Sequence, residues 1–256
     1  MMSRLLLRRS VAHGPLALVY HAVDTPRDTG RSPWSLPLRR FVAHLRMLRD
    51  EGFVVSTLAG LEGGPGRRVA ITFDDGYRNN LDAAEALTNA GFSATFFVVS
   101  DNLGCAPGWH DVDGPRDNLM DAAELRALAT RGFEIGSHSA VHTRLTALSV
   151  SDAEAALARS HTTLTGLLGR AVESLAYPYG DWNAEVAAAA RRVGFLRACT
   201  TQSGWALRDG DPFRIRRLSV LREDTPARLA RKLASAANAV DWSTIARARF
   251  AQLSAR

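Results

Sequence analysis

The chain alternates short apolar runs with longer stretches in which apolar residues recur at helical spacing. Apolar runs of about four to eight residues between polar or glycine-containing segments are typical of buried strands, and longer periodic segments that end at glycine are typical of amphipathic helices. This alternation favours an α/β protein. The predicted strands are 16–20, 53–55, 68–73, 93–100, 133–138, 172–178, 195–200 and 213–221, and the predicted helices are 41–52, 79–91, 121–132, 149–169, 183–194 and 225–238.

Several helix starts have their own signature. Ser151 and Glu154 have the spacing of a capping box at the start of the helix 149–169. Asn183 has the chemistry of an N-cap, and Pro226 stands near a helix start, where proline is tolerated.

The order of the elements predicts the fold class. About seven strand–helix pairs follow one another without a linker, which favours a closed or nearly closed parallel barrel. A doubly wound sheet is disfavoured because no glycine-rich phosphate turn follows the first strand. We expect one catalytic domain over 15–240, between an N-terminal extension (1–14) and a C-terminal tail (241–256). In such barrels the chemistry lies at the carboxyl ends of the strands.

Composition narrows the classes of partner and location. The net charge of +6 comes almost entirely from arginine, with Lys232 as the single lysine. The arginines are scattered and are not interleaved with aromatic residues, which disfavours nucleic-acid binding. Cys105 and Cys199 are the only cysteines, so a disulfide framework is excluded and a cysteine metal site is disfavoured. No apolar run suits a membrane span or a secretory signal, so we expect a cytoplasmic protein.

Two carboxylates stand side by side where the predicted strand 68–73 ends. Asp74 and Asp75 could form only an Asp-Gly turn, but adjacent buried carboxylates are costly unless a cation accepts one of them. After another strand, "HSAVH" places His138 and His142 four residues apart, within reach of one ion. Two imidazoles and one carboxylate leave an open position for water, as a catalytic divalent site requires. We therefore predict that one aspartate binds a metal ion and the other accepts a proton.

The motifs "TFDDGY", "HSAVH" and "YPYG", in this order and spacing, resemble those of the NodB-like polysaccharide deacetylases, the fourth family of carbohydrate esterases. The resemblance implies a distorted barrel of the (β/α)7 type and metal-dependent hydrolysis of N-acetyl groups on the amino sugars of a glycan. By position, Asp74 resembles the catalytic base, and Asp75, His138 and His142 resemble the metal ligands. The backbone N–H of Tyr179 would help to stabilise the oxyanion. Zinc suits this ligand set, and cobalt or nickel could replace it.

The chain departs from the family pattern at the group that orients the base. The third motif usually begins with an arginine, and Ala176 stands in its place. Arg214, Arg216 and Arg217 alternate along a predicted strand and could supply the missing group, although a charged outer face is the commoner explanation for such a cluster.

The chain also lacks the late histidine that usually serves as general acid, since no histidine follows His161. The forms "VYHAV" and "AYPYG" resemble the branch that deacetylates poly-N-acetylglucosamine-type exopolysaccharides, in which an early histidine can take this role. We predict His21 as the acid because it ends the first strand, with His110 as the next candidate. His44 and His161 lie within predicted helices and are expected to be surface or packing residues.

Three functions remain open at this point. The leading one is removal of N-acetyl groups from a poly- or oligosaccharide, and the second is metal-dependent hydrolysis of a small non-sugar amide. The third, a non-catalytic glycan-binding relative, is disfavoured because binding alone needs no proton acceptor at Asp74. The glycan, the metal and the oligomeric state stay open, as does the location, because the enzymes that the chain resembles mostly act outside the cytoplasm. The loop 101–118 is predicted to border the substrate groove.

Overall fold

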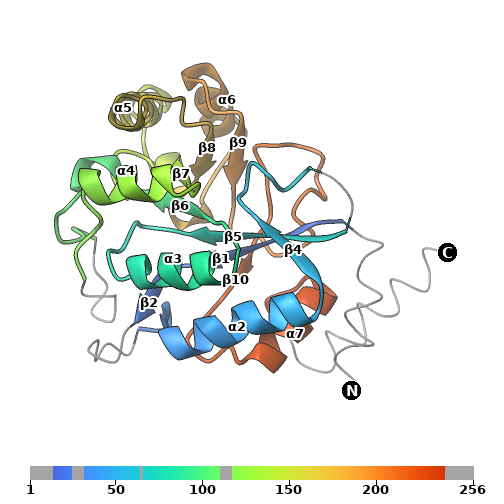
Figure 1. Ribbon diagram of the computed structural model, residues 1–256. Coiled ribbons are helices and arrows are strands. Elements are labelled where there is room, and N and C mark those ends of the chain that lie inside the picture. Colours follow the sequence, from blue (N-terminus) through green and yellow to red (C-terminus); the bar gives the residue numbers. More distant parts are fainter. Residues whose placement is uncertain (1–13, 25–31, 64–65, 110–116, 240–256) are drawn as a thin grey trace.

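The protein forms a curled parallel sheet with helices packed on its outer face (Figure 1). The computed structural model describes residues 14–24, 32–63, 66–109 and 117–239. The eight-stranded sheet has the order β10-β1-β5-β6-β7-β8-β9, with β4 paired to β5, and its described strand pairs are parallel. Its strands are β1 (Leu16–Tyr20), β4 (Phe53–Ser56), β5 (Arg67–Phe73), β6 (Thr95–Val98), β7 (Glu134–Ser137), β8 (Ser174–Ala176), β9 (Arg197–Cys199) and β10 (Leu218–Ser219). The predicted α/β barrel of the (β/α)7 type is confirmed.

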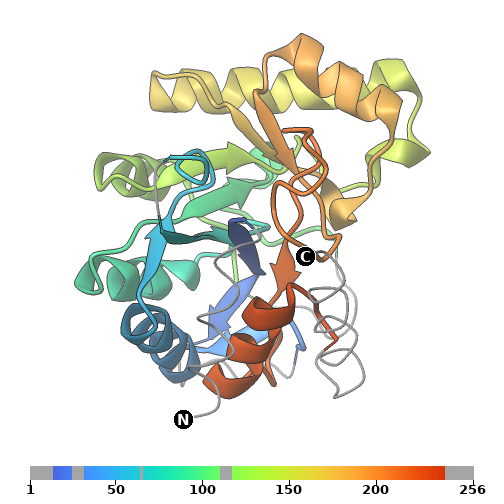
Figure 2. The same ribbon diagram turned by 90° about the vertical axis from the view of Figure 1, so that its right-hand side faces the viewer.

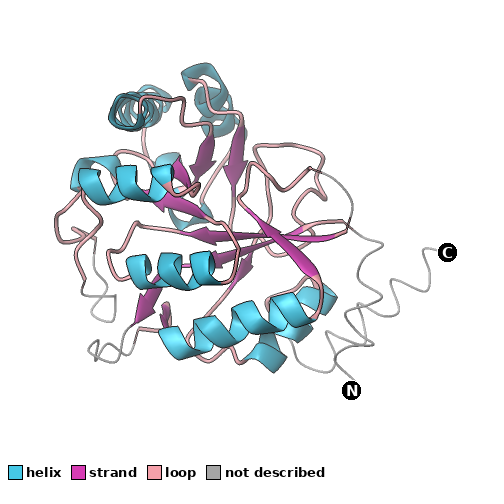
Figure 3. Ribbon diagram, viewed as in Figure 1, coloured by secondary structure: helices cyan, strands magenta, loops and turns pink. Residues whose placement is uncertain are grey.

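Helices connect the strands and cover the sheet on its outside (Figures 2 and 3). None of those in the described ranges is long and apolar enough to cross a lipid bilayer. They are α2 (Leu38–Asp50), α3 (Asn80–Asn89), α4 (Ala122–Thr130), α5 (Val150–Leu168), α6 (Ala184–Val193) and α7 (Pro226–Ser235), and a separate parallel pair is formed by β2 (Ala22–Asp24) and β3 (Ser35–Pro37). The predicted domain limits 15–240 stay a prediction, since 1–13 and 240–256 lie outside the described residues.

The segment before β10 closes the barrel. Leu218 pairs with Leu18 of β1, and Ile215 forms a parallel bridge with Cys199 of β9. Residues 215–219 therefore contact both edges of the sheet. Because the chain changes its pairing partner along this short segment, the regular strand β10 is much shorter than the strand predicted over 213–221.

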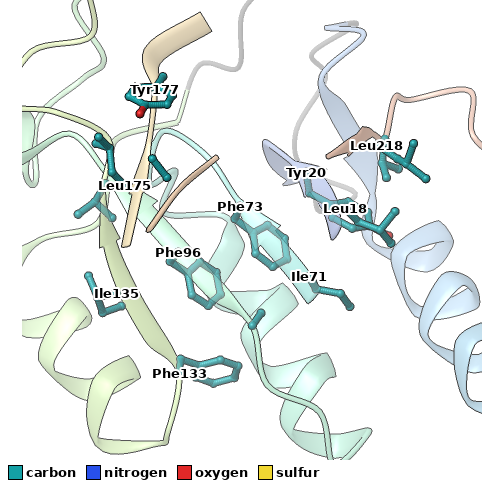
Figure 4. Packing of buried hydrophobic residues seen from close by; sticks show 14 of the residues in the cluster. Leu18, Tyr20, Ile71, Phe73, Phe96, Phe133, Ile135, Leu175, Tyr177 and Leu218 are labelled. Atoms are coloured by element: carbon teal, nitrogen blue, oxygen red, sulfur yellow. The ribbon is translucent and has the colours of Figure 1, made fainter. Parts of the chain in front are cut away.

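Successive strand residues point to opposite faces of the sheet, so the buried side chains form two clusters, one outside and one inside the barrel. Outward-facing side chains pack between the sheet and the helices, and among them Phe73 and Phe96 stack with ring centroids 4.7 Å apart (Figure 4). The inward-facing cluster consists mostly of small residues, which is why the barrel interior has room for a large polar side chain. Its buried members are Ala17, Leu58, Leu61, Ala70, Phe97, Ala176, Cys199, Ala206 and Ile215.

The capping box predicted at Ser151 and Glu154 is wrong. Ser149 is the N-cap of α5, and its hydroxyl accepts a hydrogen bond from the backbone N–H of Asp152. Glu154 instead forms an ion pair with Arg192 of α6, at 2.6 Å. Both Ser149 and Ser151 are good N-caps, and the backbone geometry selects the earlier one. The predicted N-cap Asn183 and the helix-start proline Pro226 are confirmed.

Candidate active site

Three strand ends meet at one end of the barrel, and a residue with left-handed backbone follows each of them. The φ angle is 71° at Asp75 after β5, 68° at Ser139 after β7 and 61° at Tyr179 after β8. Ala236, at the end of α7, is the only other described non-glycine residue with positive φ. Such conformations cost about 1–3 kcal/mol each and gather at functional sites. The backbone alone therefore points to this end of the barrel as the site.

The metal ligands predicted from the sequence lie together. Nε2 of His138 and Nε2 of His142 each lie 3.4 Å from Oδ1 of Asp75, and one ligand atom from each residue lies within 4.8 Å of the others. Both distances exceed those of ordinary N–H···O hydrogen bonds. They match two ligands of one tetrahedral ion, which lie about 3.3–3.4 Å apart when each is about 2.0–2.1 Å from the metal. The buried Oδ1 of Asp75 has no hydrogen-bond partner, so the group fits a divalent metal ion.

Neighbouring residues contact two of these ligands. Nδ1 of His138 lies 2.8 Å from the carbonyl oxygen of Ala176, to which it donates, so in the neutral ring Nε2 carries the lone pair that a metal ion would bind. Burial, followed by the charge of Asp75, raises the pKa of the Tyr77 phenol, so this buried ring lies beside the Asp75 carboxylate. Partners of this kind fix the tautomer and orientation of metal ligands. Tyr77 belongs to the "TFDDGY" motif, and beyond that membership nothing in the chain's pattern assigns it this position.

Asp75, His138 and His142 are called the metal group below. Asp74 points away from the metal group and into the barrel interior, where it pairs with Arg217. Both carboxylate oxygens accept hydrogen bonds from the guanidinium, each at 2.7 Å. The same guanidinium donates to the hydroxyl of Thr72 and to the carbonyl oxygen of Thr200. Both charged side chains are buried. A bidentate pair of this kind fixes the carboxylate in one orientation.

Arg217 corrects the expectation that the late arginine cluster forms a charged outer face. It is fully buried, and its guanidinium carbon lies 5.7 Å from the centre of the Phe97 ring, within the interior cluster that includes Ala176. The other two arginines do point outward: Arg216 pairs with Asp209, and Arg214 lies over the Trp182 ring.

His21 lies in the break between β1 and β2, and Asn80 holds the main chain at His21 and two residues after it. The buried Asn80 amide donates to the carbonyl oxygen of His21 at 2.7 Å and accepts from the N–H of Val23 at 3.0 Å. Nδ1 of His21 is buried without a hydrogen-bond partner, and its ring packs 4.7 Å from the ring of Trp34. The charges of Asp74 and Asp75 act on His21, which places it at the same site.

Neighbouring charges keep both carboxylates ionised. Burial acts to raise the pKa of Asp74, but the charge of Arg217, followed by that of His138, outweighs burial and holds this pKa below its ordinary value. Burial also acts to raise the pKa of Asp75, and the contact with His138 and the charges of the surrounding histidines bring it below its ordinary value. Both groups are therefore anionic near neutral pH, as a proton acceptor and a metal ligand must be.

The three histidines of the site differ in protonation. Burial lowers the pKa of His142 to about 4, and the charge of His138 acts in the same direction. Burial is also the main reason that the pKa of His21 is lowered. Burial acts to lower the pKa of His138 too, but its contact with Asp75 and the carboxylate charges raise the pKa overall. A proton on His138 therefore compensates part of the carboxylate charge in the metal-free site.

Aromatic side chains surround the metal group. The ring of His142 lies 4.5 Å from the rings of both Trp109 and Tyr179. Tyr179 belongs to the short 3-10 turn η4 (Pro178–Gly180), in which a side chain at Gly180 would collide with Thr201. Trp109, from the loop 101–118, and Tyr179 thus both contact the candidate metal ligand His142. The substrate groove along this loop stays a prediction, and 110–116 lie outside the described residues.

The remaining histidines agree with their packing interpretation where they are described. His44 is fully buried: its Nε2 donates to the carbonyl oxygen of Asp224, and its Nδ1 accepts from the hydroxyl of Tyr20. His161 packs edge-on against Phe195. His110, the second candidate for the acid, lies outside the described residues.

The fold and the Asp-His-His group together define a parallel-barrel enzyme with a candidate metal centre. The chain belongs to the polysaccharide deacetylase family, whose model matches residues 62–198, more than half of the chain. It is 26% identical over 211 residues to YxkH of Bacillus subtilis, a polysaccharide deacetylase by name, with 79% of this chain and 70% of that protein covered. Family membership identifies this chain as a deacetylase.

Solved structures share the fold. A polysaccharide deacetylase from Bacillus cereus superposes with a TM-score of 0.72 at 22% identity, over 86% of this chain and 69% of that one. IcaB from Ammonifex degensii gives a TM-score of 0.72 at 24% identity, over 87% of this chain and 97% of the other. At such identities the likeness shows the common fold alone.

Proposed function

We propose that this deacetylase hydrolyses N-acetyl groups on the amino sugars of a poly- or oligosaccharide in a metal-dependent reaction. The observation on which the proposal depends is the division of labour between adjacent residues. Asp75 faces two histidines, whereas Asp74 faces an arginine and no metal-ligating side chain among its hydrogen-bond partners in the described part of the chain. One carboxylate is thus available for an ion and the other for a proton.

Asp75, His138 and His142 would hold the ion. Zinc fits two imidazole nitrogens and one carboxylate oxygen best, and cobalt or nickel could replace it, because geometry rather than raw affinity decides between them. When bound, the ion supplies positive charge that activates a water molecule and polarises the acetyl carbonyl group.

Asp74 accepts the proton of the attacking water. Arg217 keeps the carboxylate ionised and holds it in a fixed orientation, so no reorganisation of the base is needed during the reaction. The N–H of Tyr179, in the strained turn after β8, assists by stabilising the oxyanion that forms on the acetyl carbonyl oxygen.

His21 serves as the general acid. Cleavage of the C–N bond expels an amine, which leaves readily only when it is protonated, and His21 lies at the site after β1, whereas the base follows β5. Because burial lowers its pKa, His21 is mostly neutral at pH 7 before the reaction. It therefore takes up a proton from solvent in each turnover and donates it to the leaving amine, while Asp74 releases the proton of the attacking water to solvent. The lowered pKa makes the protonated ring a stronger acid for the amine.

The proposal is tested by measuring acetate release from a panel of N-acetylated glycans and small N-acetyl amides. The assay uses the protein with zinc and after removal of metal by a chelator. We expect zinc-dependent release from glycans and little from small amides. Release from small amides alone would favour the second candidate function, and binding of glycans without release under any metal would favour a non-catalytic relative.

A further inference from the structure

The exposed aromatic residues are concentrated at the candidate site. In the described part of the chain, two large aromatic side chains are exposed, Trp34 with 40% and Tyr179 with 46% of their surface. Trp34 packs against His21, and Tyr179 packs against His142. The exposed aliphatic residues, in contrast, lie on β4, at the start of α5 and just before β9: Val54, Val150 and Leu196.

The backbone of Trp34 is fixed on both of its sides. Its carbonyl oxygen accepts from the N–H of Ala22, at 3.2 Å, and its own N–H donates to the hydroxyl of Ser32, at 3.2 Å. The preceding carbonyl, of Pro33, accepts from the N–H of Arg222, at 2.7 Å. The indole is therefore presented at the rim by a well-anchored segment, although a large part of it faces solvent.

Packing against His21 explains only part of this arrangement. A ring that serves merely to cover His21 would be most stable with both of its faces buried, because exposed aromatic surface loses the gain of burial. Exposed aromatic surface beside a polar site is instead typical of a binding surface. The C–H groups on one face of a pyranose ring are apolar and pack on the face of an aromatic ring, which makes a sugar a suitable ligand.

The chemistry of the proposed reaction determines on which side of the site the sugar lies. The amine nitrogen must be next to the acid, His21, and this nitrogen is attached to the sugar ring. The bulk of the substrate therefore lies on the His21 side of the metal group, where Trp34 is exposed.

We propose that Trp34 is the stacking platform for a sugar ring adjoining the residue that loses its acetyl group, so the enzyme acts on oligomers of N-acetylated amino sugars in preference to single sugars. This inference depends on the function proposed above. Tyr179, the other exposed aromatic residue at the site, packs on His142 and would contact the same glycan chain.

The test compares Trp34→Ala, Trp34→Phe and a surface control, Leu196→Ala, which removes an exposed apolar side chain far from the site. Two readouts are used with zinc-loaded protein: kcat/KM for acetate release from pentamers of N-acetylglucosamine and from the monosaccharide, and calorimetric binding of the same pentamers. A small activated ester, 4-nitrophenyl acetate, reports the state of the reacting groups without a sugar.

We expect Trp34→Ala to lower kcat/KM and binding affinity for the pentamers about tenfold, the size of one aromatic stacking contact. The loss in kcat/KM should be several-fold larger on the pentamers than on the ester, Trp34→Phe should recover most of the loss, and Leu196→Ala should change neither readout. Unchanged pentamer binding in Trp34→Ala would overturn the inference, as would pentamers that are neither bound nor better substrates than the monosaccharide. Pentamer binding that depends on Trp34 without any acetate release would support the platform and contradict the proposed function instead.

Discussion

Arg217 binds both carboxylate oxygens of Asp74, at 2.7 Å each, although the two residues are 143 positions apart in the chain. The pair lies inside the barrel, where neither side chain is exposed to water. The arginine that usually begins the "YPYG" motif would have to reach Asp74 from β8. In this chain the guanidinium comes instead from the segment that closes the barrel. The position that the motif arginine would occupy is Ala176, whose carbonyl oxygen orients His138.

The first prediction concerns this pair. Arg217→Lys keeps a positive charge but loses the bidentate fork, so the Asp74 carboxylate should be held less rigidly and its pKa should rise. A base with a higher pKa is protonated up to a higher pH, so the acid limb of the kcat/KM profile should move to higher pH, and activity at the optimum should fall. Arg217→Ala should in addition lower the free energy of unfolding by about 3–5 kcal/mol, because it leaves a buried charge without a partner.

Arg216→Lys is the matched control for that change. Arg216 is adjacent in sequence, but it pairs with Asp209 outside the interior cluster. Its replacement should leave the pH profile in place. An acid limb that is identical in wild type and Arg217→Lys would contradict the role of Arg217 in setting the pKa of the base.

The second prediction concerns protons and the metal. The pKa of His138 is raised in the metal-free protein, so a fraction of His138 is protonated near neutral pH, and this proton must leave before Nε2 can bind an ion. Zinc affinity should therefore decrease as the pH falls through the raised pKa of His138. Calorimetry in two buffers with different ionisation enthalpies should detect proton release when zinc binds.

His142 should contribute little to this release, because its pKa is lowered to about 4 and the ring is already neutral. His142→Ala should nevertheless abolish stoichiometric zinc binding, whereas His161→Ala, which changes a residue packed against Phe195, should not. Zinc binding with the same affinity and no proton release between about pH 6 and pH 8 would show that His138 is already neutral in the metal-free protein, contrary to this prediction.

The third prediction concerns His21. His21→Ala should keep its fold and its zinc but lose about 10²–10⁴-fold in kcat on an N-acetylated glycan, the usual contribution of a general acid. The loss should be much smaller on 4-nitrophenyl acetate, since its leaving group needs no proton. Equal losses on amide and ester would indicate a structural defect, and near-normal amide turnover would pass the role to His110.

The Asp75, His138 and His142 group could be predicted from the sequence as a candidate metal site because its members come from short motifs. Asp75 follows one strand, His138 and His142 follow another, and parallel strands of a barrel bring their carboxyl ends together. Left-handed turns follow both strands, at Asp75 and Ser139. Aspartate is enriched in this conformation, but the preference is too weak to predict the turn at a given position.

Arg217 could not be assigned with the same ease, because its position depends on a segment that pairs with two different strands. The sequence held one indication of its position. Arg217 is two residues after Ile215, so in an extended segment both side chains point to the same face, and Ile215 faces the barrel interior. The sequence alone did not show which face of this segment is buried, because Arg214 and Arg216 place the same type of side chain on the opposite face. Burial of a charge was also the less common alternative, and the partner that makes it favourable, Asp74, lies on a distant strand.

The division of labour between the two adjacent aspartates is tested most directly by measuring zinc content and acetate release in Asp74→Asn and Asp75→Asn, side by side. In Asp74→Asn, zinc should remain stoichiometric while acetate release from the glycan is abolished, because an amide cannot accept the proton of water. In Asp75→Asn, zinc should be lost together with activity. Loss of zinc in Asp74→Asn with retention in Asp75→Asn would contradict these roles and reverse them.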